Sequence, residues 1–156
     1  CSVCIEGSYS YGGGASCRIC PPGYYSREIA AVSVNSCISC PSGWTGSEDR
    51  TTCTSCPTGK FSSTSAAQSC TSCQAGATST DDHTGCICRP GYRSVSGGLV
   101  CSPCLAGSYN PTAGASTCTE CGEGDFSMHV AAVSPSICLP CPAGLLNIDK
   151  TRCDCM

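Results

Sequence analysis

Residues 37–59 read CISCPSGWTGSEDRTTCTSCPTG, and this stretch contains the unit that decides the fold. Cys40 is followed three residues later by Gly43 and then by a small polar stretch, before Cys53 and Cys56 lead into the next unit. The unit occurs nine times, with its glycines at Gly7, Gly23, Gly43, Gly59, Gly76, Gly91, Gly107, Gly124 and Gly144. Such regularity indicates a serial array, whereas an active site needs one place unlike all the others.

The composition explains why these units need cysteine. Leu, Ile, Val and Phe together make about 13% of the chain, below the roughly 20% under which a sequence lacks the apolar surface to offset its chain entropy. Twenty of the 156 residues are cysteine, a density typical of secreted disulfide scaffolds. A bridge closing a loop of about 14 residues contributes on the order of 3 kcal/mol, so bridges can substitute for a core.

Charge and hydropathy exclude several functions. With 8 basic and 11 acidic residues, the chain has no basic face for phosphates, so we expect no nucleic-acid partner. The longest uncharged apolar stretches are a few residues, far short of the ~20 that a membrane span requires, so we expect no direct membrane insertion. We predict an extracellular or cell-surface protein that needs no cofactor.

A longer period lies above the short one. CSVCIEGSYS at residues 1–10 returns as CSPCLAGSYN at 101–110, and Asp49-Arg50-Thr51 returns as Asp149-Lys150-Thr151. Six units therefore form a super-repeat of about 100 residues. We predict a first super-repeat over residues 1–100 and a partial second one over 101–156, with further chain beyond at least one end.

The local patterns predict short hairpins and turns and no long helix. Cys-Pro-x-Gly, as at Cys20 and Cys40, fits a β-turn with proline at its second position. Most units place an aromatic residue one or two positions after the glycine, and we expect these rings to pack against neighbouring disulfides rather than to bind a ligand. The aromatic residues are Tyr9, Tyr24, Trp44, Phe61, Tyr92, Tyr109 and Phe126.

The pattern Cys-x-x-Gly-x-aromatic, a polar stretch and Cys-x-x-Cys resembles the ephrin-receptor-like cysteine-rich repeats of the growth-factor-receptor cysteine-rich superfamily, and more loosely the modules of tumour-necrosis-factor receptors. The resemblance covers the whole chain and implies a small disulfide-rich fold, an elongated serial array of about nine single-disulfide mini-units. It also implies a ladder of bridges. These are Cys4–Cys17, Cys20–Cys37, Cys40–Cys53, Cys56–Cys70, Cys73–Cys86, Cys88–Cys101, Cys104–Cys118, Cys121–Cys138 and Cys141–Cys153, with Cys1 and Cys155 bonded to units outside this chain.

A second pairing scheme stays open. It crosses the bonds within alternate four-cysteine blocks, for example Cys1–Cys17 with Cys4–Cys20, and it uses all twenty cysteines. It leaves residues 21–36 and three similar stretches without a bridge, although they carry the same signature. Spacing alone does not decide connectivity, and we favour the ladder.

Other chemistry fits the sequence less well. Paired Cys-x-x-Cys is also a zinc-ribbon spacing, but zinc requires a reducing compartment. The histidines, His83 and His129, have no nucleophile and base around them. Asp81 and Asp82 beside His83 are the best-placed candidates for a cation, yet they fall short of the six to eight oxygens of a Ca²⁺ site. We predict no metal site and no enzyme.

The sequence also predicts attached glycans and association with other protein chains. Asn110-Pro111-Thr112 is blocked by its proline, and Asn35-Ser36-Cys37 would use a cysteine that we expect to be bridged. The many serines and threonines, and prolines such as Pro111, are instead candidates for O-linked or hydroxyproline-linked sugars. Partners would otherwise be further copies of the chain or other extracellular structural proteins.

Two functions from different classes fit this array. The first is a structural stalk or filament segment of a cell surface or appendage, in which neighbouring units transmit stiffness. The second is a receptor or adhesion ectodomain that binds a protein ligand through unit loops. A receptor should gather exposed aromatic and arginine residues at one unit, whereas a filament should show uniform small polar loops. This sequence shows uniform small polar loops, so we predict the structural stalk or filament segment.

Overall fold

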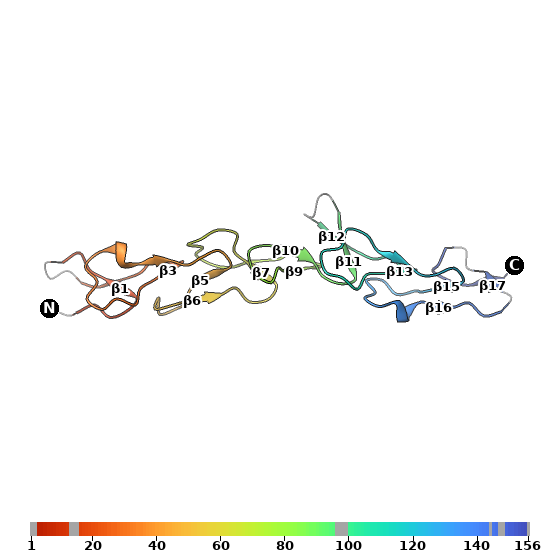
Figure 1. The fold of residues 1–156 in the computed structure, drawn as a ribbon, viewed down its shortest axis with the longest axis horizontal. Coiled ribbons are helices and arrows are strands. Elements are labelled where there is room, and N and C mark those ends of the chain that lie inside the picture. The colour runs from red at the N-terminus through yellow and green to blue at the C-terminus, as the bar shows by residue number, and fades with distance from the viewer. Residues whose placement is uncertain (1–2, 13–15, 96–99, 144, 147–148, 156) are drawn as a thin grey trace. The chain divides into compact units, whose positions relative to one another are not determined.

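The computed structural model describes residues 3–12, 16–95, 100–143, 145–146 and 149–155. Over these residues it contains nine two-stranded sheets, each made of strands that are consecutive in the chain (Figure 1). The pairs are β1 (Ser8–Tyr9) with β2 (Arg18–Ile19), β3 (Tyr24–Tyr25) with β4 (Ile38–Ser39), β5 (Trp44–Gly46) with β6 (Cys53–Ser55), β7 (Lys60–Phe61) with β8 (Thr71–Ser72), β9 (Ala77–Ser79) with β10 (Cys86–Cys88), β11 (Tyr92–Val95) with β12 (Val100–Pro103), β13 (Ser108–Tyr109) with β14 (Thr119–Glu120), β15 (Asp125–Phe126) with β16 (Leu139–Pro140), and β17 (Leu145–Leu146) with β18 (Asp154–Cys155). Each hairpin belongs to one mini-unit, and we number the mini-units 1 to 9 from Cys4 onward.

In the described part of the chain, helical structure is limited to single turns. The 3-10 helices η1 (Val34–Ser36) and η3 (Pro135–Ile137) lie at corresponding places in mini-units 2 and 8. Each begins after a serine, Ser33 or Ser134, whose Oγ accepts a backbone N–H two residues later. The predicted fold class, a serial array of single-disulfide mini-units with short hairpins, is confirmed.

Nine disulfides close the mini-units. They join Cys4 to Cys17, Cys20 to Cys37, Cys40 to Cys53, Cys56 to Cys70, Cys73 to Cys86, Cys88 to Cys101, Cys104 to Cys118, Cys121 to Cys138 and Cys141 to Cys153. The structure thus has the ladder and not the crossed blocks. Cys1 and the side chain of Cys155 lie outside the described residues.

The half-cystines are the core of this protein. Among the described residues, the buried apolar side chains are eight cysteines together with Tyr9, Ala31 and Ala132. Tyr9 and Ala31 pack with Cys20 and Cys37 in one small cluster, against which Tyr24 also packs. The expected packing of the unit aromatics against disulfides is therefore found at Tyr9 and Tyr24. Trp44 differs, because 40% of its surface is exposed.

The glycine turn lies one residue later than the sequence predicts. The N–H of Tyr24 donates to the Pro21 carbonyl at 3.1 Å, and the N–H of Trp44 donates to the Pro41 carbonyl at 3.2 Å. Proline is therefore the first residue of the turn and glycine the third, with φ of +83° at Gly23. That third position is where a type II turn requires positive φ, which explains the glycine. Gly144 lies outside the described residues.

The same glycines make a second contact, which we call the glycine clamp. In five cases a turn glycine lies against the backbone of a left-handed residue two mini-units further on, so closely that a Cβ would collide with a carbonyl group. The clamped pairs are Gly7 with Arg50, Gly23 with Ala66, Gly43 with His83, Gly91 with Ala131, and Gly107 with Lys150. The left-handed residues have φ between 55° and 61°.

Backbone hydrogen bonds accompany the clamp. The N–H of Gly43 donates to the Ser62 carbonyl at 2.8 Å, and the N–H of Ser62 donates to the His83 carbonyl at 2.9 Å. The N–H of Ala66 donates back to the Cys40 carbonyl at 2.8 Å. Three successive mini-units are thus tied together by main-chain atoms, and each hairpin depends on its neighbours.

The contacts divide the chain into two compact parts. The first consists of residues 1–73 and 79–86, and the second of residues 74–78 and 87–156. The first contains three clamped glycines and the second contains two. The super-repeat boundary after residue 100 is a period of the sequence, and it stays a prediction.

Replacement of a clamped glycine tests the clamp. We expect Gly43→Ala to destabilise its surroundings by about 2–4 kcal/mol, because alanine is strained at positive φ and its methyl group collides with the Asp82 carbonyl. Gly124→Ala is the matched control: its φ is also +81°, but no described residue lies within 4 Å of the added methyl group, so about 1 kcal/mol is expected. With the disulfides intact, hydrogen exchange at the Ser62 amide measures the loss of local stability in Gly43→Ala, and exchange at the Ser127 amide measures the loss in Gly124→Ala. Equal losses in the two variants would contradict the clamp.

Proteolytic mapping under non-reducing conditions tests the ladder. We expect peptides that link Cys20 to Cys37 and Cys121 to Cys138, because these half-cystines are bonded in the structure. A peptide that links Cys4 to Cys20 would instead establish the crossed blocks.

Candidate functional site

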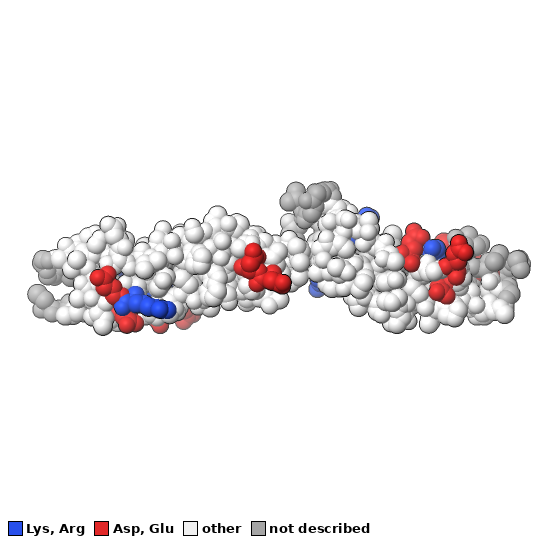
Figure 2. All heavy atoms as spheres, viewed as in Figure 1, with Lys and Arg blue, Asp and Glu red and all other residues white. Residues whose placement is uncertain are grey.

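The sequence provides no single obvious site, and the fold brings side chains together where neighbouring mini-units meet. On the face shown in Figure 2, charged residues form a few small clusters on an otherwise uncharged surface. The described residues of neighbouring mini-units line surface hollows in both parts, among them two in the first compact part and one in the second. No described group of His, Cys, Asp and Glu side chains is arranged to hold a metal ion.

The first hollow has a volume of about 290 Å³ and lies between mini-units 2 and 3. Tyr25 and Arg27 line it from the side of β3, and Trp44 lines it from β5. The Arg27 guanidinium carbon lies 5.9 Å from the centroid of the Tyr25 ring, a cation–π distance. We call these three residues, with Pro41, the Tyr25–Trp44 surface.

Local structure explains why these side chains meet. Successive residues of a strand point to opposite faces, so Tyr24 packs in the cysteine cluster while Tyr25 points away from it. Gly46 has no side chain, and its Cα lies so close to the Tyr24 backbone that a Cβ would be 2.7 Å from the Tyr24 carbonyl oxygen. β5 therefore lies against β3, which brings Trp44 beside Tyr25.

The second super-repeat has different residues at the equivalent positions. Counting from Cys121 as from Cys20, Tyr25 corresponds to Phe126, Arg27 to Met128 and Trp44 to Leu145. Met128 is 74% exposed. The scaffold is repeated, but the combination of tyrosine, arginine and tryptophan occurs only in the first copy.

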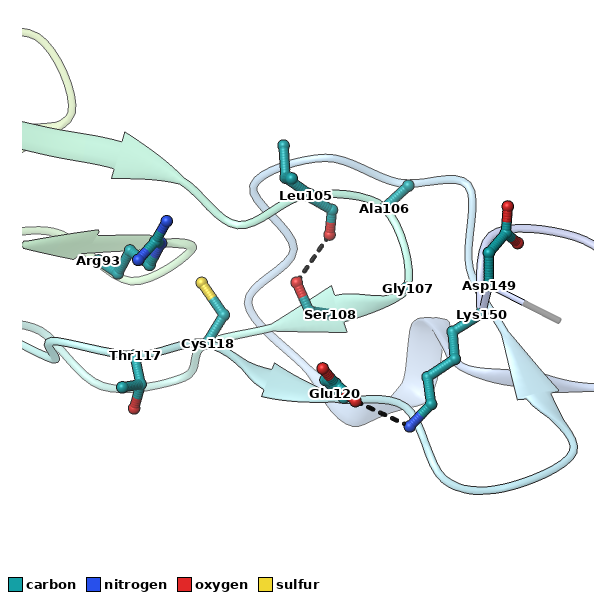
Figure 3. Close-up of a pocket in the computed structure, with 10 residues that line it drawn as sticks. All are labelled: Arg93, Leu105, Ala106, Gly107, Ser108, Thr117, Cys118, Glu120, Asp149 and Lys150. Atoms are coloured by element: carbon teal, nitrogen blue, oxygen red, sulfur yellow. Dashed lines mark hydrogen bonds and ion pairs between the residues drawn. The ribbon is translucent and has the colours of Figure 1, made fainter. Parts of the chain in front are cut away.

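A larger hollow lies in the second compact part and has a volume of about 570 Å³ (Figure 3). Leu105 and Asp149 line it, together with an ion pair between the Lys150 Nζ and a Glu120 Oε2 oxygen at 3.0 Å. The same Nζ donates to the Cys121 carbonyl at 2.9 Å. This hollow therefore contains a cation that already has protein partners.

A hollow of about 430 Å³ occupies the equivalent place in the first super-repeat. Ile5 corresponds to Leu105 and Asp49 to Asp149, and both hollows lie where a glycine turn meets the loop that clamps it. Ile29 and Glu6 complete the lining. The two hollows are thus the same site of the scaffold with different chemistry.

Three clamp loops share the pattern Asp-x-Thr, in which the middle residue is left-handed. They are residues 49–51, 82–84 and 149–151. In the second loop, the Asp82 carboxylate accepts the Thr80 hydroxyl at 2.6 Å and the Thr84 N–H at 3.0 Å, and these hydrogen bonds lower the pKa of Asp82 to about 2. The pKa of Asp49 and that of Asp149 are lowered by the same kind of bond.

Of the residues singled out for cation binding, Asp82 and His83 therefore have a structural role, whereas Asp81 takes no part in the loop hydrogen bonds. Asp82 holds the loop that clamps Gly43, and His83 is its left-handed residue. The His83 Nδ1 is buried without a hydrogen-bond partner among the described residues. His129 lies on an exposed segment, and its N–H donates to Ser127 Oγ.

Sequence reasoning missed the Tyr25–Trp44 surface. Its residues belong to two mini-units, and of these residues only Trp44 is among the unit aromatics singled out from the sequence. A signal was present, since Gly46 interrupts a strand-forming segment and a glycine there indicates a close backbone approach.

The comparisons agree with this architecture. No curated protein matches the chain. A family model described as tyrosine-protein kinase ephrin type A/B receptor-like matches residues 7–52 and 91–138, which together make up more than half of the chain. The fold is that of a disulfide-stapled repeat array of the ectodomain type. The chain belongs to the ephrin-receptor-like cysteine-rich repeat family, a non-catalytic family.

The family and the nine disulfides define an extracellular, receptor-like domain. Among the described residues, no helix is both long and apolar enough to span a membrane.

Acid titration tests the role of Asp82. Because its folded-state pKa of about 2 lies below the ordinary value of 3.8, the ionised carboxylate stabilises the loop at higher pH. We expect this stabilisation to be lost as the pH falls from about 4 to about 2, with faster exchange of the Thr84 amide. Asp82→Ala should show that fast exchange already at neutral pH. Asp81→Ala is the control, because Asp81 takes no part in these bonds, and an equal effect there would contradict the assignment.

Proposed function

We propose that this chain is part of a receptor or adhesion ectodomain that binds a protein ligand, and that the Tyr25–Trp44 surface is the centre of the contact. Tyr, Trp and Arg are the residues that dominate binding energy at protein interfaces. Their combination at one exposed place, absent from the equivalent place in the second copy, is the observation that supports binding over a purely mechanical role.

The geometry suits a protein partner. Trp44 is 40% exposed, so part of the indole is packed and the remainder offers a rigid apolar surface at little cost in side-chain entropy. Arg27 adds a cation beside the Tyr25 ring, and a partner carboxylate or aromatic group would complement both. The disulfides on either side, Cys20–Cys37 and Cys40–Cys53, hold the two hairpins in place before binding.

The structural stalk or filament remains a second candidate. The glycine clamp favours it, because within each compact part it couples mini-units two apart through main-chain atoms and would transmit force along that part. The two functions are compatible, since a stiff array can carry a binding surface. Self-association and glycans on the serine-rich loops would belong to the structural role.

Binding of the purified 156-residue chain to cells of its source tests the proposal. We expect saturable binding that Trp44→Ala weakens by at least about 30-fold, because an interface residue of this kind contributes about 2 kcal/mol or more. Met128→Ala is the matched control, since Met128 is exposed in the equivalent region of the second copy and should change binding less than threefold. Disulfide mapping of both variants verifies the fold.

Two results would count against the receptor reading. Saturable binding that is equally strong in the wild type and Trp44→Ala would remove the Tyr25–Trp44 surface as its centre. Concentration-dependent assembly of the chain with itself, without binding to cells, would favour the filament.

A further inference from the structure

The hollow formed by Ile5, Glu6, Ile29, Asp49 and Thr51, which we call the Ile5–Asp49 hollow, is separate from the Tyr25–Trp44 surface and has its own chemistry. The hollow forms where the glycine clamp brings mini-units 1 and 3 together. The Gly7 turn of mini-unit 1 lies against the Asp49 carbonyl of mini-unit 3, and the N–H of Ala30 in mini-unit 2 donates to the Cys4 carbonyl at 2.7 Å. Three mini-units therefore fix the positions of the lining residues.

The hollow offers apolar surface to solvent. Ile5 is 75% exposed and Ile29 is 63% exposed, and both line the hollow. Neither belongs to the cysteine cluster that packs around Tyr9. A partner with an apolar side chain would remove both isoleucines from water.

The charged residues of the lining are acidic. Glu6 and Asp49 are its two charged members, and neither forms an ion pair with a described Lys or Arg. Hydrogen bonds from the Ser47 hydroxyl and the Thr51 N–H lower the pKa of Asp49, which keeps its carboxylate ionised. Two carboxylates are too few for a Ca²⁺ site, so a metal ion is not the natural partner.

Arg50 follows Asp49 in the chain but does not supply the missing cation. Its guanidinium donates to the Gly46 and Ser47 carbonyls, each at 3.1 Å, within its own loop. The negative charge of the hollow is therefore left for a partner.

The second super-repeat shows the complementary case. Lys150, the counterpart of Arg50, lines its hollow and pairs with Glu120 (Figure 3). Ala106 stands where the first copy has Glu6. Where the chain supplies its own lysine, the ammonium group and an apolar leucine, Leu105, thus line the same hollow.

From this complementarity we infer that the Ile5–Asp49 hollow binds a segment of a protein partner in which a Lys or Arg is flanked by an apolar side chain. The basic group would meet the Glu6 and Asp49 carboxylates, and the apolar group would cover Ile5 and Ile29. The inference concerns a second surface and does not depend on the Tyr25–Trp44 surface being occupied.

Peptide binding to the full chain tests this inference. The probes are the peptide Gly-Leu-Lys-Leu-Lys-Gly, blocked at both ends, and its counterpart with Glu in place of both Lys. Amide chemical shifts of the ¹⁵N-labelled 156-residue protein measure binding residue by residue. We expect the basic peptide to shift the Glu6 and Thr51 amides in a saturable manner, to shift Ala106 and Thr151 much less, and to bind more weakly as salt is added.

Charge-neutralising variants localise the effect. Glu6→Gln combined with Asp49→Asn should weaken binding about fivefold, the sum expected for two exposed ion pairs. Asparagine keeps an acceptor for the Ser47 and Thr51 donors, so the loop should persist. Asp149→Asn is the control, because it removes the same loop charge from the other hollow and should leave peptide binding unchanged.

Three results would overturn the inference. They are equal binding of the acidic peptide, equal shifts at both hollows, and unchanged affinity in the Glu6→Gln, Asp49→Asn variant. None of these results would bear on the proposed role of the Tyr25–Trp44 surface, because that role is tested by the binding of Trp44→Ala to cells and not with this peptide.

Discussion

The contact between a turn glycine and a left-handed residue two mini-units later is the constraint on which the rest of this structure depends. A single-disulfide hairpin with two-residue strands has too little buried surface to fold alone. The clamp ties it to its neighbours through backbone atoms, as at Gly43, where no side chain would fit beneath the Asp82 carbonyl. Each disulfide closes one mini-unit, whereas the clamp determines how mini-units follow one another within each compact part.

Because the clamp uses glycine and main-chain groups, it places few demands on other side chains. Arg50, Ala66 and His83 all serve as its left-handed residue, although they differ in size and charge. The loops can therefore diverge while the scaffold stays constant. At one pair of equivalent positions the first copy has Trp44 and the second has Leu145. At another pair the first copy has Glu6 and the second has Ala106. This freedom allows a repetitive protein to present distinct surfaces.

Much of the fold was predictable because its signals are local. The cysteine spacing and the glycine three residues after each opening cysteine indicate the mini-unit, and the family resemblance implies the ladder that the structure contains. The turn was misplaced by one residue, since Cys-Pro-x-Gly fits two turn registers and only the Tyr24 to Pro21 hydrogen bond separates them. The clamp was not predicted, because it joins residues about forty positions apart, such as Gly7 and Arg50.

The candidate sites were harder to predict for the same reason. Tyr25 and Trp44 lie in different mini-units, and only the close approach of Gly46 to the Tyr24 backbone brings them together. The individual loops are alike, which favours a filament. The surfaces formed where two mini-units meet nevertheless differ from one another. In a repeat array a binding surface arises at the junctions, since a junction combines side chains from two or three loops and can vary without disturbing any one unit. The family match and the Tyr25–Trp44 surface therefore support a receptor-like function on a scaffold whose regularity first indicates a structural one.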